Sequence, residues 1–329
     1  MAIETASRTL AAIHRPVRAE LDATVEELER IVRSDFPLVG DVNTYLLRLR
    51  GKLFRPTLLL LGARATDTLD SRKVRLAASI ELIHLATLVH DDSVDHSVLR
   101  RGQPTVNSLF SHQVAVIMGD YLYSRAIQEL VALHDWEPMQ VMSRVTNEMT
   151  VGEMRQLEAH DRIAYGLEDY ERLIRAKTAS LVSAACELGG YDAGPAIREA
   201  LRRFGHALGM AFQITDDVLD YTESEAVTGK PSGHDLKEHK ITLPLIAALP
   251  ACDEADRGAI DALMADADPS DDQVACVIAI VRSRGGVEAA RERALGFARE
   301  AEGELDALAP GEAREALQAA LVYAVERRR

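Results

Sequence analysis

The chain has 329 residues, of which 47% are hydrophobic and 27% charged, a balance typical of soluble globular proteins. A formal net charge of −14 argues against nucleic acid as the main partner. There is no uninterrupted apolar run of about 18 residues, and residues 1–15 lack the pattern of a secretory signal. The three cysteines have no metal-binding spacing. We therefore expect a cytoplasmic protein without a transmembrane segment, and leave peripheral membrane contact open.

Apolar residues recur every three or four positions along most of the chain, a spacing that predicts amphipathic helices. Pro37 and Gly40 predict a break, and polar loops are expected at residues 96–105 and 222–240. No long alternating strand pattern, repeat or shift in composition divides the chain, so we predict a single all-α domain over residues 1–329. The predicted helices cover residues 6–33, 42–49, 57–65, 76–95, 108–133, 138–160, 169–188, 195–221, 241–249, 254–265, 271–284, 287–308 and 312–326.

Three carboxylates close the apolar helix predicted from residue 76. Asp91 and Asp95 are i,i+4 neighbours, and Asp92 and Asp95 are i,i+3 neighbours. Like charges at this spacing repel, so a cation is expected among them. An oxygen-only cluster without cysteine favours Mg²⁺ or Ca²⁺ over zinc. Taken alone, this motif is equally compatible with a solvated acidic helix end.

A second D-D-x-x-D motif lies on the helix predicted over residues 195–221. Its carboxylates, Asp216, Asp217 and Asp220, share one side of the helix with Gln213. Two such motifs on apolar helices are hard to explain as surface. If they face one another, they form a cage for several cations that bridge to substrate phosphates.

Basic residues flank the predicted helix ends and loops near both motifs. Arginine gives fork-like hydrogen bonds to phosphate oxygens, and lysine acts as a mobile point charge. Each is more often a solvated surface charge when considered alone, but their shared placement favours phosphate binding. His84, about two turns before Asp91, is also favoured as a ligand over a structural histidine. The basic residues are Lys52, Arg55, Arg100, Arg101, Lys177, Lys230 and Lys240.

These motifs together resemble the trans-isoprenyl diphosphate synthases, or polyprenyl synthetases, in order and spacing along most of the chain. Two positions depart from the family pattern: Arg50 and His239 stand where glycine is usual, which puts the loop before Lys240 in question. The matching segments are Gly51-Lys52-x-x-Arg55-Pro56, His84 through Asp95, Arg100-Arg101-Gly102-x-Pro104-Thr105, Gly119-Asp120, Lys177-Thr178, Phe212-Gln213 through Asp220, Gly229-Lys230-x-x-Gly233-x-Asp235-Leu236 and Lys240-x-Thr242-Leu243-Pro244-Leu245.

The resemblance implies a homodimer of isoprenoid-synthase-type helical bundles that condenses isopentenyl diphosphate with an allylic diphosphate, using about three Mg²⁺ ions. It makes Asp91, Asp95 and Asp216 the principal metal ligands, with Asp92, Asp217 and Asp220 in support. Lys52, Arg55, His84 and Arg101 would hold isopentenyl diphosphate. The allylic diphosphate would be held by Arg100, Lys177, Thr178, Gln213, Lys230 and Lys240, and the catalytic residues would be Lys177, Thr178, Gln213 and Lys230.

The residues one turn before Asp91 bear on product length. In the family that the chain resembles, bulky aromatics there accompany short products and small residues accompany long ones. Ala86 and Thr87 are small, so we predict a product longer than twenty carbons, with Met118 a candidate for the floor of the tunnel.

Other classes remain as alternatives. A short-chain farnesyl or geranylgeranyl synthase shares the motifs. A terpene cyclase normally lacks the second aspartate motif, and a non-catalytic subunit would be expected to have lost acidic residues, all six of which are present here. A phosphohydrolase of the His-Asp type, prompted by His90-Asp91, leaves the two acidic motifs without a role.

Overall fold

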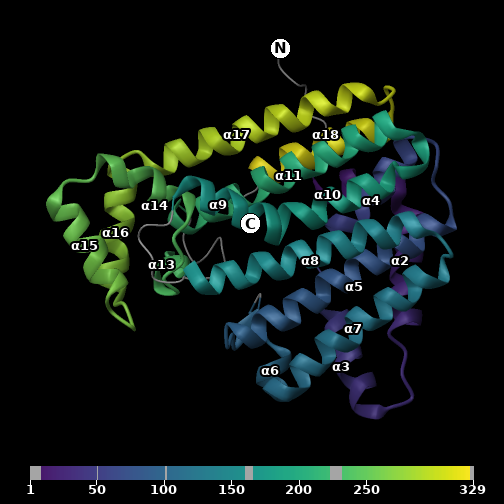
Figure 1. The fold of residues 1–329 in the computed structure, drawn as a ribbon, viewed down its shortest axis with the longest axis horizontal. Coiled ribbons are helices and arrows are strands. Elements are labelled where there is room, and N and C mark those ends of the chain that lie inside the picture. Colours follow the sequence, from purple (N-terminus) through teal and green to yellow (C-terminus); the bar gives the residue numbers. More distant parts are fainter. Residues whose placement is uncertain (1–8, 50, 101, 160–165, 223–231, 327–329) are drawn as a thin grey trace. The chain divides into compact units, whose positions relative to one another are not determined.

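The computed structural model describes residues 9–49, 51–100, 102–159, 166–222 and 232–326. Within these ranges the secondary structure is helical except for one short hairpin, so the predicted all-α class is confirmed (Figure 1). The hairpin pairs β1 (Leu99–Arg100) with β2 (Gln103–Pro104) in antiparallel register. No helix in the described ranges is long and apolar enough to cross a membrane.

The chain forms two compact units, and the single-domain organisation stays a prediction. The first unit comprises Met1–Val145, Leu181–Gly205 and Glu304–Ala320, and the second comprises Thr146–Ser180, His206–Gly303 and Leu321–Arg329. Helices of the first unit are α1 (Leu10–His14), η1 (Arg15–Val17), α2 (Arg18–Ile31), α3 (Pro37–Arg48), α4 (Phe54–Ala65), α5 (Ser71–Val94), α6 (Val106–Leu109), α7 (His112–Ala132), η3 (Tyr191–Ala193) and η5 (Leu305–Ala307).

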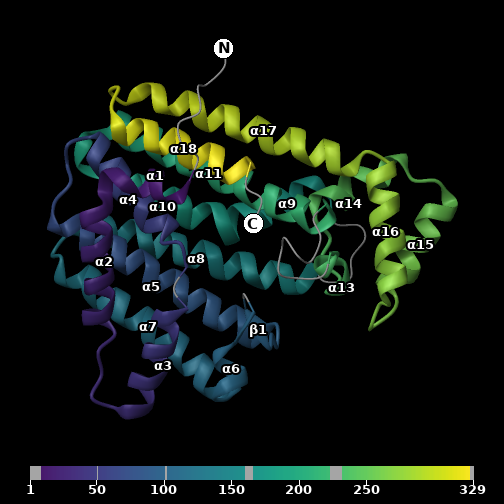
Figure 2. The same ribbon diagram turned by 180° about the vertical axis from the view of Figure 1, so that it is seen from behind.

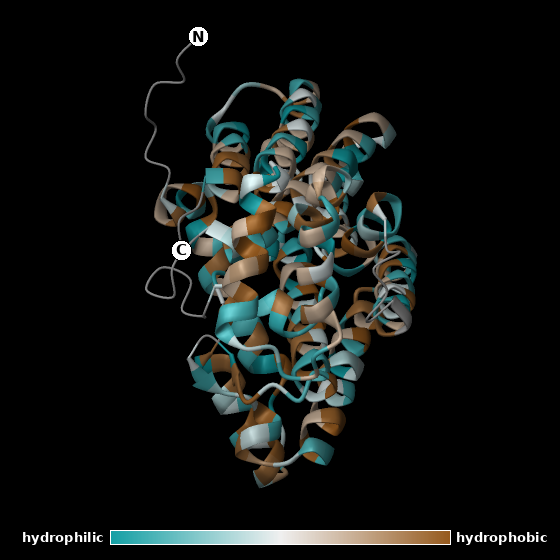
Figure 3. Ribbon diagram, turned by 90° about the vertical axis from the view of Figure 1, so that its left-hand side faces the viewer, coloured by the Kyte–Doolittle hydropathy of each residue, from teal (hydrophilic) through white to brown (hydrophobic). Residues whose placement is uncertain are grey.

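The helices that lie wholly or almost wholly in the second unit are α9 (Leu167–Ile174), η2 (Arg175–Ala179), α13 (His234–Lys237), α14 (Leu243–Ala248), η4 (Leu249–Ala251), α15 (Glu254–Met264), α16 (Asp271–Ser283) and α17 (Gly286–Glu304). Four further helices contribute residues to both units: α8 (Trp136–Ala159), α10 (Ser180–Gly189), α11 (Pro195–Thr222) and α18 (Glu312–Glu326). Hydrophobic and hydrophilic residues alternate around the helices, as the predicted amphipathic spacing requires (Figure 3).

Helix α5 is the centre of the first unit. Asp70 caps its start by accepting hydrogen bonds from the backbone N–H groups of Arg72 and Lys73. Its 24 residues span about 36 Å, and buried side chains occur all around its circumference. It packs against α2, α4 and α7, and the first acidic motif lies at its C-terminal end. Figure 2 shows α6 and β1 beside that end.

Prolines and caps shift three predicted boundaries. Pro37 does not break the chain but begins α3, because proline costs no hydrogen bond at the first helical position. Pro16 lies in the 3₁₀ turn η1, which divides the predicted opening helix. The helix predicted over residues 108–133 begins anew at α7, whose first turn is capped by the Ser111 side chain accepting from Val114 N–H.

Gly119 allows α5 and α7 to approach closely. A Cβ atom at this position would lie 2.2 Å from Nε2 of His90 on α5. The same imidazole nitrogen lies 3.1 Å from the carbonyl oxygen of Val116 and 3.4 Å from an Asp120 carboxylate oxygen. The glycine therefore makes room for a histidine that joins the two helices.

We expect Gly119→Ala to lower the free energy of unfolding by about 1–3 kcal/mol, because the new methyl group must displace the His90 ring from its contacts. Denaturant unfolding of the purified protein measures this change. The matched control is Gly258→Ala in α15, where a Cβ meets no atom within 4 Å and the change should be neutral or stabilising by up to about 1 kcal/mol. Equal stability of the two variants would contradict the close-approach role of Gly119.

Candidate active site

The first acidic motif is buried only in part. Asp92 is 7% exposed, whereas Asp91 is half-buried and Asp95, the C-cap residue that follows α5, is exposed. Arg100 Nε, on β1, donates to both Asp92 carboxylate oxygens at 2.8 and 2.9 Å. The hairpin after α5 thus neutralises the one deeply buried carboxylate, and Arg100 is engaged by protein in this structure. Arg101 lies outside the described residues.

A cavity of about 180 Å³ lies in the first unit beside this motif. Of the residues predicted to hold isopentenyl diphosphate, His84 lines it, while Lys52 is exposed and Arg55 is half-buried in the first turn of α4. The lining consists of Tyr45, Leu46, Leu49, Gly51, Glu81, His84, Leu85, Leu88, Val89, Asp92, Arg100, Gln103, Pro104, Thr105 and Val106.

Glu81 is a lining residue that our sequence reasoning missed. It is only 3% exposed and lies one helical turn before His84, on the same face of α5. The i,i+3 spacing of a carboxylate and a histidine on an apolar helix was the available signal. Its burial places a second acidic side chain, besides Asp92, on the wall of this cavity.

Asp217 of the second acidic motif belongs to a series of side-chain hydrogen bonds. Asp217, on α11, accepts from Gln213 Nε2 at 2.8 Å and from the Tyr170 hydroxyl at 2.5 Å. The Thr178 hydroxyl in turn donates to Gln213 Oε1 at 2.8 Å. Four side chains from α9, η2 and α11 are therefore connected through Asp217, and our sequence reasoning did not identify Tyr170 as one of them.

Burial and neighbouring charge together raise the pKa of Asp217 well above the ordinary range for aspartate. Loss of hydration is the largest cause, followed by the negative charge of Asp235, while the hydrogen bonds from Tyr170 and Gln213 act in the opposite direction. Carboxylates crowded in this way are stabilised in their charged form by a cation. The donor set is all oxygen, which suits Mg²⁺ or Ca²⁺.

Lys177 and Thr178 lie in a turn that a regular helix would not provide. Residues Arg175–Ala179 form the π-helical turn η2 between α9 and α10, where our sequence analysis expected one continuous helix. Wider turns of this kind occur frequently at functional sites. Lys177 Nζ lies 2.8 Å from Glu153 Oε2 and 3.1 Å from Gln156 Oε1, both on α8. Gly152 on α8 leaves room for the turn, since a Cβ there would lie 2.6 Å from that of Ala176.

Asp220 holds the start of α13. Its two carboxylate oxygens accept from the backbone N–H groups of His234 and Asp235, at 3.1 and 3.0 Å. Gly233, which precedes them, has a φ of 76°, and a Cβ there would lie 2.3 Å from Val274. Asp220 therefore holds α13 in place, besides any support that it gives to a metal.

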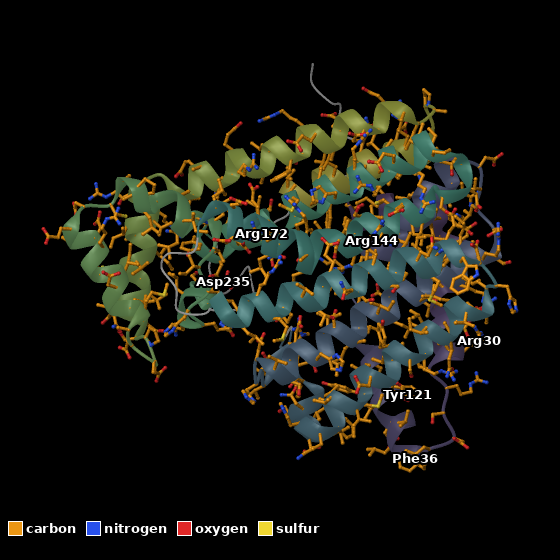
Figure 4. The ribbon with its side chains drawn as sticks, in the orientation of Figure 1. Arg30, Phe36, Tyr121, Arg144, Arg172 and Asp235 are labelled. Carbon is orange, nitrogen blue, oxygen red and sulfur yellow. The ribbon has the colours of Figure 1, made fainter. Side chains whose placement is uncertain are left out.

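Asp235 is a fourth carboxylate of this cluster, which our sequence analysis quoted in a matching motif without giving it a role. It is labelled in Figure 4 and lines the cavity of the second unit. Burial raises its pKa to about 7, with contributions from the negative charges of Asp220 and Asp216 and an opposing one from Lys240. A raised pKa is expected where several carboxylates lie close together without a bound cation.

The second unit has a cavity of about 190 Å³ with these groups in its wall. Five of its lining residues are ones that we predicted to bind the allylic diphosphate or to belong to the second metal motif: Lys177, Thr178, Gln213, Asp217 and Lys240. The remaining lining residues are Gln156, Tyr170, Leu173, Ile174, Asp235, His239, Ile241 and Thr242. Lys230 lies outside the described residues.

His239 stands where the family usually has glycine, and it keeps the backbone conformation that glycine favours. His239 itself adopts a left-handed conformation with a φ of 54°, and its Nε2 lies 2.9 Å from the carbonyl oxygen of Asp266. The next residue, Lys240, donates its backbone N–H to the Asp235 carbonyl at 2.8 Å. Lys240 Nζ pairs with Glu238 at 2.6 Å. Lys240 is thus held at the cavity despite the missing glycine. Arg50, the other departure, lies outside the described residues.

We expect His239→Gly to change the free energy of unfolding by less than about 1 kcal/mol, because relief of the left-handed strain offsets the lost contact to Asp266. His239→Val, by contrast, should lower it by about 1–3 kcal/mol, since β-branched side chains strongly disfavour this conformation. Thermal or denaturant unfolding distinguishes the two. Equal tolerance of valine and glycine would show that the positive φ is unimportant.

The residues predicted to set product length lie in the first unit. Ala86 and Met118 are each 2% exposed, on α5 and α7, and the half-buried Thr87 donates its hydroxyl to the His84 carbonyl at 2.8 Å. None of the three lines the cavity of that unit. Their role in product length stays a prediction.

In the described part of the chain, no three histidine, cysteine, aspartate or glutamate side chains converge closely enough to hold a metal ion by themselves. The supply of further ligands by a polyanionic substrate is compatible with this, because Mg²⁺ commonly takes substrate phosphates and waters as ligands.

Known proteins share both the motifs and the fold. The polyprenyl synthetase family model matches residues 37–281. Heptaprenyl diphosphate synthase component 2 of Geobacillus stearothermophilus is 39% identical over 281 residues, which cover 85% of this chain and 87% of that protein. An all-trans-nonaprenyl-diphosphate synthase of Rhodobacter capsulatus is 40% identical, with 85% of this chain and 86% of that protein covered.

Among solved structures, a decaprenyl diphosphate synthase from Rhodobacter capsulatus matches with a TM-score of 0.92 and 35% identity, covering 98% of this chain and 100% of that one. A polyprenyl synthase from Caulobacter crescentus, solved with calcium and isoprenyl diphosphate, has a TM-score of 0.92 and 30% identity, with 98% of each chain covered. The fold is the isoprenoid synthase fold. The chain therefore belongs to the polyprenyl synthetase family and is a trans-prenyltransferase that makes long-chain polyprenyl diphosphates.

Proposed function

We propose that this enzyme condenses isopentenyl diphosphate with an allylic diphosphate and that the cavity of the second unit holds the allylic substrate. The observation that carries the proposal is the composition of this cavity, where the cationic groups of Lys177 and Lys240 accompany the oxygens of Thr178 and Gln213. Apolar side chains such as Leu173 and Ile241 complete its wall. Such a lining suits a ligand with a charged head and a hydrocarbon tail.

The chemistry places two demands on these residues. Departure of the diphosphate leaves an allylic cation and a leaving group of high negative charge, which Lys177 and Lys240 stabilise by their positive charge. The cation must then meet isopentenyl diphosphate before water does, and the apolar lining excludes water. The oxygens of Thr178 and Gln213 face the electron-poor carbon with the negative ends of their dipoles. No protein nucleophile is needed.

We propose Mg²⁺ as the metal, about three ions per active site, with Asp91, Asp95 and Asp216 as principal ligands. The all-oxygen donor set and the raised pKa of Asp217 and Asp235 support this choice. When bound, the metal supplies positive charge to the departing diphosphate. Asp92 and Asp220 contribute mainly by holding Arg100 and the start of α13, respectively.

On the isopentenyl side, we propose that His84, Lys52, Arg55 and Arg101 bind the diphosphate and that Arg100 assists on the allylic side. His84 lines the first-unit cavity with Glu81, a buried carboxylate able to orient a neighbouring cation. Arg100 is already bonded to Asp92. Its guanidinium can offer its remaining N–H groups to phosphate, because it carries five donors.

The test is release of pyrophosphate by the purified protein, measured with isopentenyl diphosphate and a farnesyl primer, followed by mass spectrometry of the products. We expect release that requires both Mg²⁺ and isopentenyl diphosphate. Release from the allylic substrate alone would identify a terpene cyclase, and no release under any condition would identify a subunit that needs an active partner. Either result would overturn the proposal. A product of roughly twenty carbons or fewer would place it with the short-chain synthases.

We propose that the enzyme works as a homodimer through α7. This helix leaves the apolar side chains of Val116 and Ile117 on the surface at 40% and 64% exposure, and a second copy of the helix would cover them. Light scattering of the purified protein should give twice the monomer mass, and Ile117→Asp should lower it. A monomer that becomes active only with a second protein would contradict this assignment.

We further propose a cytoplasmic location, supported by three free cysteines, of which Cys276 is exposed. Contact with a membrane surface during product release stays open. Binding to lipid vesicles with and without product present would measure it.

A further inference from the structure

The chain of hydrogen bonds through Asp217 points to a positioning residue outside both acidic motifs. We propose that the Tyr170 hydroxyl fixes the orientation of Gln213 and Thr178, through Asp217, so that their oxygens face the allylic substrate. The proposal deepens the proposed function and rests on it, because it assumes that Gln213 and Thr178 face the reacting carbon. Tyr170 itself is a positioning residue and not a catalytic one.

The first step in the argument is the polarity of the bonds. Asp217 Oδ1 accepts from the amide nitrogen of Gln213 at 2.8 Å, so the amide group of Gln213 turns its nitrogen toward Asp217. The amide oxygen then points the other way, where the Thr178 hydroxyl donates to it at 2.8 Å. Because the single hydroxyl proton of Thr178 is used in this bond, its oxygen can present only lone pairs to the cavity.

The second step is the position of Asp217 itself. Its two oxygens accept from different donors, Gln213 on Oδ1 and Tyr170 on Oδ2. A carboxylate held at one oxygen can swing about its side-chain bonds, whereas one held at both oxygens cannot. Tyr170 provides the second anchor and is 1% exposed, so water is poorly placed to replace it.

The third step is the separation of these parts along the chain. Tyr170 is on α9, Thr178 is in the π-helical turn η2, and the other two residues are on α11. All four side chains line the same cavity. The hydrogen bonds therefore tie the wide turn that carries Lys177 and Thr178 to the helix that carries the second acidic motif, and they do so at the cavity wall.

The experiment is a double-mutant cycle of Tyr170→Phe and Thr178→Val, with turnover and KM measured for the purified enzyme with a farnesyl primer. Loss of a buried hydrogen bond, which leaves Asp217 Oδ2 without its partner, predicts that Tyr170→Phe lowers kcat by about tenfold or more, with a smaller change in the KM for isopentenyl diphosphate. The two losses should be less than additive, because each substitution breaks the same series of hydrogen bonds and frees Gln213 at one of its two ends.

Tyr221→Phe is the matched control. Tyr221 is also fully buried in the second unit, and its hydroxyl makes no hydrogen bond to Asp217 or Gln213. Removing that hydroxyl should change kcat by less than about threefold. The control separates the specific bond to Asp217 from the general effect of deleting a buried hydroxyl, and thermal unfolding of each variant confirms that the fold persists.

Equal kcat values for Tyr170→Phe and Tyr221→Phe would overturn the proposal, as would strictly additive losses in the double mutant. Wild-type turnover of Thr178→Val would also overturn it, while the proposed diphosphate and metal roles, tested separately at Asp216, would stand. If Tyr170→Phe fails to fold, Gln213→Glu provides the test. Two facing carboxylates repel, so this variant should reproduce the loss in kcat and be insensitive to Thr178→Val. If Gln213→Glu and Thr178→Val lower kcat additively, the proposed positioning role of Tyr170 is contradicted.

Discussion

Asp216→Ala is expected to lower turnover by about a thousandfold or more while the protein remains folded. The proposed role of this carboxylate is to hold metal at the departing diphosphate, and metal charge contributes several kcal/mol to transition states of this kind. A loss of about 4 kcal/mol corresponds to roughly three orders of magnitude in rate. The measurement is pyrophosphate release at saturating Mg²⁺ and both substrates, with circular dichroism to follow the helices.

Asp261→Ala provides the control for this prediction. Asp261 is an exposed carboxylate on α15 of the same unit, so its removal changes net charge equally and should leave turnover within about twofold. Turnover of the Asp216 variant within tenfold of the wild type would refute the metal assignment. Loss of activity in both variants would point to net charge as the cause.

The second large effect expected is a change of product. Ala86→Phe should shift the products from long chains to roughly twenty carbons or fewer, because each added five-carbon unit gains about 4 kcal/mol of apolar burial and only a steric stop can oppose that gain. Ala86 lies five residues before Asp91 and is 2% exposed. A phenyl ring at this position must therefore fill space that the growing prenyl product would otherwise occupy, or displace the neighbouring side chains. Mass spectrometry of the products measures the shift.

Thr87→Phe gives an independent version of this experiment at a half-buried position, where overpacking is less severe. Thr87→Ser is the control, since it retains the hydroxyl that bonds to the His84 carbonyl and adds no bulk. Unchanged product length in both phenylalanine variants, with the fold intact, would show that elongation does not pass these residues.

Most of the helices were predictable because their signals are local. The predicted helix over residues 312–326 coincides with α18, and that over residues 254–265 differs from α15 by one residue. Period, caps and helix-starting prolines act within a few residues of one another, so they can be read from the sequence. The acidic motifs were found for the same reason, since i,i+3 and i,i+4 spacing places side chains on one face of a helix.

The sequence by itself therefore determined the helical class, the two acidic motifs, the basic residues around them and, through their resemblance to a family, the reaction. Only the tertiary structure decided which groups those motifs contact. Tyr170 and Asp217 are 47 positions apart and share no periodic relation, yet they are joined by a 2.5 Å hydrogen bond. The wide turn at Thr178 and the raised pKa of Asp235 likewise depend on helices from distant parts of the chain. Local spacing fixes the face of a helix that a residue occupies, whereas packing determines the partner that the face meets.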